Sequence, residues 1–241
     1  MAVRVTFSYV RLRSELAEKI TKNLAMSSEE FNAALDDFIK NNDQGFNKDN
    51  ILCMFLPNTY EVYFNVLPED LVKKFNGEYK KFWNDDRLNK AKAMGHTPIE
   101  VSILASIVQA ESVKSEEAPV IAGLYLNRLK KGIALQADPT LVFAVGDFTL
   151  KRVLNSHKEI ESPYNTYKYP GLPPGPINVP QIASIDAVLN YQPNDYYYIC
   201  AKEDFSGFHN FAHNLEDHTR NARKYQRALD IEMEKARQNK K

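Results

Sequence analysis

The alternation of strand and helix signals along the sequence predicts an α+β fold. Residues 1–66 carry strand, helix, helix and strand signals in that order. Residues 67–95 form one long amphipathic pattern, and residues 96–241 mix helices with short strands. We therefore expect a small βααβ module at 1–66, a helical connector at 67–95 and a larger α+β domain at 96–241.

The composition is that of an ordinary globular chain and indicates no highly charged partner. Of the 241 residues, 44% are apolar and 26% are charged, and 31 Lys and Arg balance 31 Asp and Glu. Hence no electrostatic argument favours a nucleic acid or an anionic membrane surface. Thirteen Tyr and thirteen Phe are more informative, because amphipathic rings pack in cores and also line clefts for uncharged polar ligands such as sugars.

Cysteine spacing and hydropathy show no sign of a metal or redox site, a signal peptide or a membrane-spanning segment. Cys53 and Cys200 lie far apart, without the spacing of a metal or redox site. The stretch from Met1 to Val10 lacks signal-peptide architecture, and no run of about 18 apolar residues is present. As it stands, the sequence predicts a soluble piece.

The first 95 residues carry the signals of the module and the connector. The β-branched and aromatic run Val3–Val10 predicts a strand, and Ser14 then caps a helical pattern. A second helical pattern follows from Ser28. Strand-like runs follow at Ile51–Leu56 and Thr59–Phe64, separated by a Pro-Asn turn. Over 67–95 the charges form a solvated helical face opposite an apolar one, which consists of Leu71, Phe75, Tyr79 and Phe82.

The stretch from Thr97 to Ser112 predicts a buried helix with one carboxylate at its far end. Thr97 and Glu100 form a capping box around Pro98, and the residues that follow are almost all apolar. Glu111 interrupts this pattern on the apolar side. There, burial and the negative end of the helix dipole both disfavour the ionised form, which raises the pKa toward that of a general acid. The alternative is an exposed residue in the last helical turn.

The segments that follow predict the surroundings of Glu111. A second helix begins at Ser115 and ends at Gly132, and the short link between the helices leaves Glu111 at a corner that a cleft can reach. Leu135–Thr140 predicts a polar turn. The SPYNTY and GLPPGPI segments are stiff because of their prolines. A cleft wall and a loop strapped across the core are equally good interpretations of them.

The last sixty residues predict a helix, a hairpin and a final helix. Val179–Tyr191 has a helical pattern, and DYYYICA and FHNFAH predict two strands around the turn Glu203–Gly207. Asn214 with Asp217 marks the start of the last helix, whose charged tail is expected to fray.

Five motifs, taken together, resemble one known family. SILASIVQAES, NRLKKGIALQADPT, SPYNTY, GLPPGPI and FAHNLEDH occur in the order seen in the YceG-like (MltG) endolytic murein transglycosylases, over roughly Pro98 to Tyr225. The resemblance implies that Glu111 is the catalytic glutamate. It also implies that five residues line or support the active-site cleft, namely Gln136, Asp138, Tyr164, Asn165 and Tyr167. The chain departs from the family pattern at Gln109, which is often acidic in relatives, and at Val179, Pro180 and Gln181 in place of a frequent Asn-Pro-Gly.

The same resemblance implies a location and a set of partners. Residues 1–66 are similar to the LysM-like subdomain of the family, and 96–241 would be its catalytic YceG-like domain. Family members usually begin with a cytoplasmic tail and one transmembrane helix, so the sequence is expected to be a truncated ectodomain. The intact protein would be anchored in the bacterial cytoplasmic membrane and face the cell wall on the extracytoplasmic (periplasmic) side. The implied partners are peptidoglycan glycan strands and peptidoglycan synthases, with no nucleic acid and no cofactor.

The resemblance further implies cleavage of the MurNAc–GlcNAc bond of nascent strands with 1,6-anhydro-MurNAc ends. One carboxylate suffices for this reaction, because the muramic acid's own hydroxyl attacks the anomeric carbon. Asp138 facing Glu111 would instead indicate a hydrolytic muramidase. A non-catalytic peptidoglycan-binding scaffold would leave Glu111 exposed with an ordinary pKa. A metal site of His209, His213 and His218 is least favoured, because these residues straddle a strand and a helix start.

Overall fold

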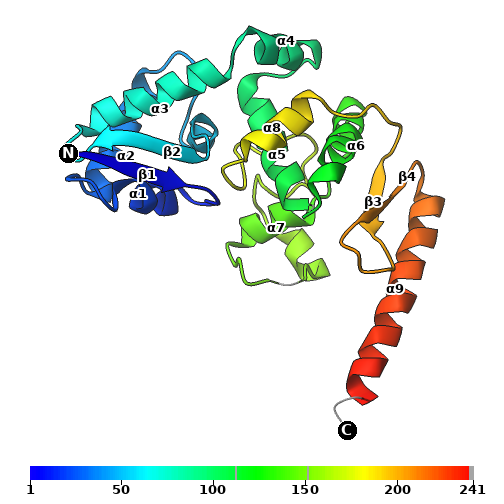
Figure 1. The fold of residues 1–241 in the computed structure, drawn as a ribbon. Helices are drawn as coiled ribbons and strands as arrows, with labels where there is room; N and C mark the ends of the chain where they lie inside the picture. Colours follow the sequence, from blue (N-terminus) through cyan, green and yellow to red (C-terminus); the bar gives the residue numbers. More distant parts are fainter. Residues whose placement is uncertain (112, 151, 239–241) are drawn as a thin grey trace.

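The computed structural model describes residues 1–111, 113–150 and 152–238, and it combines many helices with short antiparallel strands (Figure 1). The mixture confirms the predicted α+β fold. In chain order the elements are β1 (Ala2–Phe7), α1 (Arg13–Thr21), α2 (Ser28–Asn41), η1 (Ile51–Met54), β2 (Asn58–Tyr63), α3 (Pro68–Phe82), α4 (Asp85–Ala93), α5 (Pro98–Glu111), η2 (Ser115–Glu117), α6 (Ala118–Lys130), α7 (Asp138–Val145), η3 (Asn155–Glu159), α8 (Ile182–Leu189), β3 (Tyr198–Ala201), β4 (His209–Ala212) and α9 (Leu215–Gln238).

The N-terminal module is built on the antiparallel pair β1 and β2, with α1, α2 and α3 around it (Figure 1). Ala2 lies opposite Tyr63 and Phe7 opposite Asn58. Phe75 of α3 inserts into the core of this module, with its ring centroid 6.0 Å from that of Phe7 and 5.1 Å from that of Tyr60. The first half of the expected connector therefore contributes to the module's core. The division at 1–66, 67–95 and 96–241 stays a prediction.

Two expected features of residues 51–95 differ from the structure. The run Ile51–Leu56 is not a strand, because Ile51–Met54 forms the 3₁₀ helix η1. All four of its side chains are buried, and a short, uniformly apolar run has no periodicity that separates strand from helix. The amphipathic pattern over 67–95 is also broken into α3 and α4, because the Asn84 side chain accepts a hydrogen bond from Arg87 N at 3.1 Å and starts a new helix.

Ser14 does not cap the first helix. The chain enters α1 one residue earlier, at Arg13, and the Glu15 carboxylate accepts the backbone N–H of Arg11 at 2.9 Å and that of Leu12 at 3.4 Å. The second helix begins at Ser28 as expected, and Ser27 caps it. Both helices exist as predicted, and only the start of the first one shifts.

Helix α5 is the centre of the second half of the molecule, with α6, α7 and α8 around it (Figure 1). Its capping box is confirmed, since Glu100 N donates to Thr97 Oγ1 at 3.2 Å and Thr97 N donates to Glu100 Oε2 at 2.7 Å. Its apolar residues from Val101 to Val108 are buried. Ser112, the expected end of the stretch, lies outside the described residues.

The end of the proline-rich segment is strapped to α5 by hydrogen bonds. Ile177 N donates to Ser106 Oγ at 3.1 Å, the Asn178 amide donates to Ser106 O at 2.8 Å, and Gln181 N donates to Gln109 Oε1 at 2.6 Å. The chain is held in this way up to Gln181, and helix α8 begins at Ile182, three residues after the expected start. The strap fixes the loop against the helix that carries Glu111.

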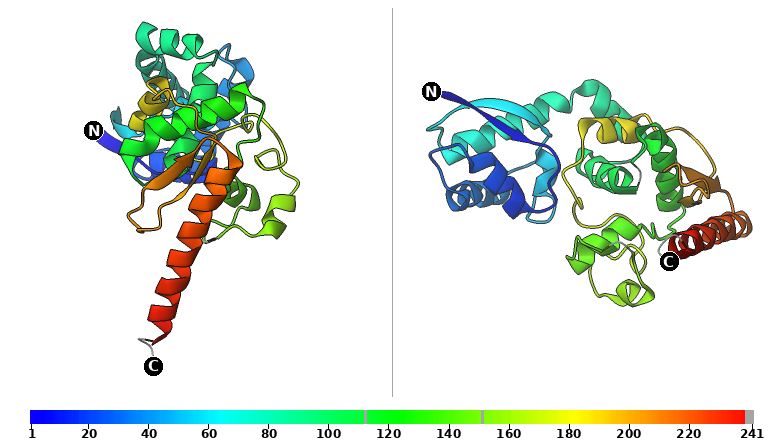
Figure 2. Two further views of the ribbon diagram at one scale, coloured as in Figure 1. Left: turned by 90° about the vertical axis from the view of Figure 1, so that its right-hand side faces the viewer. Right: turned by 60° about the horizontal axis from the view of Figure 1, so that its bottom comes forward.

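The C-terminal hairpin and helix follow the prediction. β3 and β4 pair antiparallel, with Tyr198 opposite Ala212, and Asp217 N donates to Asn214 Oδ1 at 2.8 Å at the start of α9. Figure 2 shows α9 extending away from the rest of the molecule.

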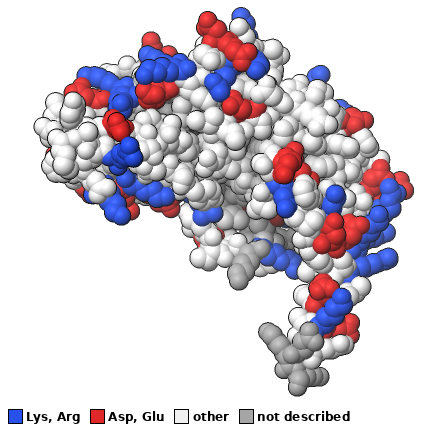
Figure 3. Space-filling model, viewed as in Figure 1, with Lys and Arg blue, Asp and Glu red and all other residues white. Residues whose placement is uncertain are grey.

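Lys and Arg mix with Asp and Glu over the face in Figure 3, as the balanced net charge predicts. The charged tail that was expected to fray is helical through Gln238, and residues 239–241 lie outside the described residues. No described helix is long and apolar enough to cross a membrane.

Candidate active site

Glu111 is the last residue of α5, and its carboxylate is held by a tyrosine of the next long helix. The Tyr125 hydroxyl of α6 donates to Glu111 Oε1 at 2.5 Å. Tyr125 is itself fully buried, whereas Glu111 keeps some solvent access. The bond therefore fixes one carboxylate oxygen on the protein side, while the partial exposure of Glu111 gives a ligand access to the carboxyl group.

The surroundings of Glu111 shift its proton equilibrium toward neutral pH. Burial raises the pKa of Glu111 from an ordinary 4.5 to about 7. The charge of Asp138 acts in the same direction, while the Tyr125 hydrogen bond and His209 lower this pKa. Near neutral pH, both the acid and the carboxylate form are thus populated, as a group that first gives and then takes a proton requires.

Asp138 is presented by a helix that was expected to be a turn. Asp138–Val145 forms α7, with Pro139 in its first turn and Gly146 (φ +76°) after its last residue. Proline fits a first helical turn as well as it fits a polar turn, so the DPT sequence alone does not separate the two. Asp138 Oδ1 accepts a hydrogen bond from the Tyr167 hydroxyl at 2.5 Å.

Gln136 lies before α7 in a left-handed backbone conformation (φ +54°). Its side-chain Oε1 accepts a hydrogen bond from Arg128 Nη2 at 2.7 Å, and its backbone N donates to Thr166 O at 3.0 Å. Arg128 also donates to the backbone oxygens of Ala134 and Tyr197, at 2.9 and 2.7 Å. Gln136 is therefore a rigid part of the wall, tied to α6 on one side and to the SPYNTY loop on the other.

Two cavities meet at Glu111 and Asp138, which line both of them. The first, of about 660 Å³, extends along α7 to residues of the N-terminal module, including Tyr9 and Arg11. The second, of about 420 Å³, extends the other way and is lined by Tyr125, Arg128, Gln136, Lys158, Tyr167 and Tyr198, among others. The two carboxylates hence border both cavities, an arrangement that suits an extended ligand with parts in each.

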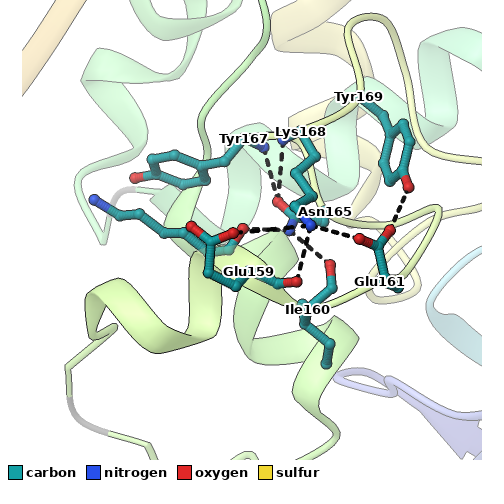
Figure 4. Close-up of polar contacts among 8 residues, drawn as sticks. Glu159, Ile160, Glu161, Asn165, Tyr167, Lys168 and Tyr169 are labelled. Carbon is teal, nitrogen blue, oxygen red and sulfur yellow. Dashed lines mark hydrogen bonds and ion pairs between the residues drawn. The ribbon is translucent and has the colours of Figure 1, made fainter.

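Tyr164 and Asn165 do not line either cavity, which differs from the expectation that they share a cleft with Glu111. Asn165 is fully buried, and its amide donates to the backbone oxygens of Lys158 and Ile160, both at 2.9 Å, and accepts from Tyr167 N at 3.0 Å. Figure 4 shows it at the centre of the loop, with the Tyr167 ring pointing away from it. Asn165 thus shapes the loop that presents Tyr167.

Tyr164 packs its half-buried ring on Phe143 of α7, with 4.7 Å between ring centroids. Gly175 of the GLPPGPI segment lies beside the Tyr164 hydroxyl and against Asp49 O of the N-terminal module, so closely that a Cβ on it would lie 1.8 Å from that oxygen. Tyr164 therefore supports α7 and the loop from behind the cleft wall.

The three histidines of the least favoured alternative, a metal site, lie at separate places. His209 pairs with Glu117 and His213 with Asp195, each at 2.8 Å, whereas His218 stacks on Tyr198 at 5.3 Å. Over the described ranges, no group of three metal-ligating side chains comes together.

Sequence reasoning missed Tyr125, Arg128, Lys158 and Tyr198 as cleft residues. Tyr125 and Arg128 had a usable signal, because they are polar groups at helical spacing on the otherwise apolar face of α6. Lys158 and Tyr198 reach the cleft from a 3₁₀ turn and a strand far apart in sequence, and no local pattern identifies them.

Comparisons with known proteins agree with the motifs. The model of the YceG-like family matches residues 2–224. An endolytic murein transglycosylase of Bacillus subtilis is 36% identical over 160 residues, which are 65% of this chain and 42% of that protein. One of Streptococcus pneumoniae is 31% identical over 169 residues, which are 68% of this chain and 30% of that protein. The chain thus matches less than half the length of these curated relatives.

A solved structure supports the fold. The crystal structure of a yceG-like protein from Listeria monocytogenes superimposes with a TM-score of 0.75 at 24% identity, and it covers 90% of this chain and 75% of that one. At this identity the likeness concerns the fold alone. With a family model that matches nearly its whole length, the chain belongs to the YceG-like family.

Proposed function

We propose that this chain is the part of an endolytic peptidoglycan lytic transglycosylase that cleaves the MurNAc–GlcNAc bond and leaves 1,6-anhydro-MurNAc ends. The proposal rests on one observation above all. A glutamate with a pKa of about 7 lies where two cavities meet, in a member of a family whose curated relatives are named endolytic murein transglycosylases.

In the proposed reaction, Glu111 acts first as an acid and then as a base. The protonated carboxyl gives its proton to the glycosidic oxygen, and the bond from that oxygen to the anomeric carbon of MurNAc breaks. The primary hydroxyl of the same MurNAc attacks the anomeric carbon, and the Glu111 carboxylate takes the hydroxyl proton. No water is consumed. Because the nucleophile belongs to the substrate, its effective concentration is high once the cleft holds the sugar in the right conformation.

The other site residues have supporting roles in this scheme. Tyr125 orients the Glu111 carboxyl through their hydrogen bond, and the charge of Asp138 helps to keep Glu111 protonated at neutral pH. Gln136, Asp138 and Tyr167 are proposed to contact the glycan, since they line the smaller cavity. Cavities on both sides of Glu111 suit a cut inside a strand, because sugars are bound before and after the cleaved bond.

A hydrolytic muramidase is the second candidate, and Asp138 is the observation that favours it. Asp138 lines both cavities with Glu111 and is close enough for its charge to raise the Glu111 pKa. A second carboxylate of this kind is what ordinary glycosidases use as nucleophile or base. A scaffold that binds without cutting would leave Glu111 exposed with an ordinary pKa, and the raised pKa of Glu111 argues against it.

The test is mass spectrometry of the products after digestion of purified peptidoglycan. Anhydro ends support the transglycosylase, reducing ends support the muramidase, and uncut sacculi support the scaffold. The size distribution of released glycan distinguishes internal cleavage, which shortens all strands early, from cleavage at strand ends, which releases disaccharides from the start.

The wider biological setting is likewise proposed. The family membership supports action on the extracytoplasmic side of the cytoplasmic membrane, with an N-terminal membrane helix outside residues 1–241 as anchor and peptidoglycan synthases as partners. Residues 1–66 are proposed as a LysM-like subdomain, 67–95 as a connector and 96–241 as the catalytic domain. Fractionation of cells that carry the full-length protein tests the anchor, and limited proteolysis tests the boundaries.

A further inference from the structure

Arg11 of the N-terminal module is a cation in the larger cavity that forms no ion pair with any described residue. Its guanidinium carbon lies 4.8 Å from the ring centroid of Tyr9 and 4.6 Å from that of Phe148. Tyr9, Arg11 and Phe148 all line the cavity that contains Glu111. Ring stacking holds the plane of a guanidinium but leaves the N–H groups at its edge free to bind an anion.

The backbone around Arg11 is fixed at both of its neighbours. Arg11 N donates to Glu15 Oε2 at 2.9 Å, which ties the residue to the start of α1. The carbonyl of the buried Val10 accepts a hydrogen bond from Val179 N at 2.7 Å. Arg11 is therefore held by its own module and by the loop that straps α5.

The same loop connects Arg11 to the region of Glu111. Asn178, next to Val179, accepts a hydrogen bond from the Gln109 amide at 3.0 Å, and Gln109 precedes Glu111 by two residues on α5. Since every step in this path is a backbone bond or a polar contact of a part-buried side chain, the position of Arg11 relative to Glu111 is set by the fold.

The carboxylates that line the larger cavity have hydrogen-bond partners, whereas its arginines have no ion-pair partner among the described residues. Its two carboxylates, Glu111 and Asp138, each accept a hydrogen bond from a tyrosine hydroxyl at 2.5 Å. Arg11 and the exposed Arg152, which also lines the cavity, make no ion pair among the residues that the structure describes. A part-buried arginine gains most from a carboxylate partner that binds both N–H edges, and no described residue supplies one to Arg11.

We propose that Arg11 is a subsite for a carboxylate that the glycan carries on the lactyl arm of MurNAc. Two sources offer this chemistry: a carboxylate of the attached stem peptide, or the lactyl carboxylate itself on a strand without peptides. The proposal rests on the proposed function for the identity of the glycan. It assigns to the N-terminal module a direct part in substrate selection.

The test measures binding and cleavage separately. Binding is measured by calorimetry in the Glu111→Gln background, so that no turnover interferes, and KM and kcat are measured with Glu111 intact. The probes are uncrosslinked glycan strands with stem peptides, the same strands with the peptide carboxylates amidated, and strands stripped of peptides by an amidase. Arg11→Gln is compared with Arg4→Gln, which removes the same charge from an exposed pair with Glu61 in the same module.

On the probe whose carboxylate Arg11 binds, Arg11→Gln should weaken binding and raise KM by about ten-fold, with kcat nearly unchanged. This is the effect expected for the loss of one charge-assisted hydrogen-bond pair. Arg4→Gln should change neither. An effect lost on amidated strands identifies the peptide carboxylate, and an effect confined to stripped strands identifies the lactyl carboxylate. Arg11→Lys should recover part of the affinity, which also controls for misfolding.

Equal binding of all three probes by parent and Arg11→Gln overturns the subsite. Absence of cleavage by the parent protein refutes the proposed function instead, and the binding arm then still decides whether Arg11 holds an anion. The two failures are therefore distinguishable.

Discussion

Glu111 and Asp138 face the same groove from opposite kinds of helix end. Glu111 is the last residue of α5, and Asp138 is the first residue of α7. Each accepts one tyrosine hydrogen bond at 2.5 Å, from Tyr125 and Tyr167 respectively. The negative end of a helix dipole disfavours a carboxylate, whereas the positive end stabilises one.

The comparison teaches that burial, rather than the tyrosine bond that both carboxylates share, sets the proton affinity of Glu111. Tyr125 lowers the pKa of Glu111, yet burial outweighs that bond and brings the pKa to about 7. Asp138 contributes by its charge, which raises the pKa of its neighbour. On this account Glu111 carries the proton, and Asp138 acts as a fixed negative charge.

The largest expected effect comes from removing the proton carrier. Glu111→Gln keeps the shape but can neither donate nor accept the proton, and loss of general acid–base assistance costs on the order of a hundred-fold to ten-thousand-fold for each role. Muropeptide release is the measurement. The matched control is Glu100→Gln in the capping box of the same helix, which should retain activity and lose less than about 1 kcal/mol of stability.

Asp138→Asn tests whether Asp138 acts on Glu111 only through its charge. If Asp138 is only a fixed charge, its removal lowers the Glu111 pKa, and the alkaline limb of the kcat/KM profile moves to lower pH. At a pH above the limb, activity should fall about ten-fold for each unit by which the Glu111 pKa drops, because the protonated fraction falls by that factor. A loss as large as that of Glu111→Gln, with no shift of the limb, would assign Asp138 a covalent or base role and favour the muramidase.

Tyr125→Phe should move the same limb in the opposite direction. The Tyr125 hydrogen bond lowers the Glu111 pKa, so its loss raises that pKa and extends activity to higher pH. The buried bond to a charged group should also contribute about 1.5–3 kcal/mol to stability. The pH profiles of Asp138→Asn and Tyr125→Phe are measured side by side. If the alkaline limbs of the two variants shift in the same direction, the account is wrong.

The smallest effect is on stability as a function of pH. Because the folded-state pKa of Glu111 lies above its unfolded value of 4.5, its contribution to stability is fully present below about pH 4.5 and is lost as pH rises through about 7. The stability of Glu111→Gln relative to the parent protein should therefore increase as pH rises, by on the order of 1–3 kcal/mol at pH 8. Thermal melts at pH 4.5 and pH 8 measure it. A stability difference independent of pH would mean that the Glu111 pKa is not raised.

The sequence predicted α5 well because its signals are local. The capping box of Thr97 and Glu100, the apolar run and the terminal Glu111 all act within one helix, and the structure contains them as expected. The hairpin of β3 and β4 was predicted for the same reason. Local rules do not depend on where the rest of the chain lies.

The walls of the cleft could not be predicted in this way because they depend on distant contacts. Asn165 has the polarity of a ligand-binding residue, but its side-chain amide bonds to three backbone groups of its own loop, and only the folded loop reveals this. Arg11 has no motif at all. It reaches the cleft because Val10 pairs with Val179, which is distant in sequence.

The most direct test of the central claim is digestion of peptidoglycan in water labelled with heavy oxygen. A single proton carrier and an attacking sugar hydroxyl consume no water, so the account predicts anhydro-MurNAc ends without label. The Glu111→Gln variant should yield no new ends. Reducing ends that carry the heavy isotope would show that water is the nucleophile, and would contradict the assignment of Glu111 as the sole acid and base of an intramolecular reaction.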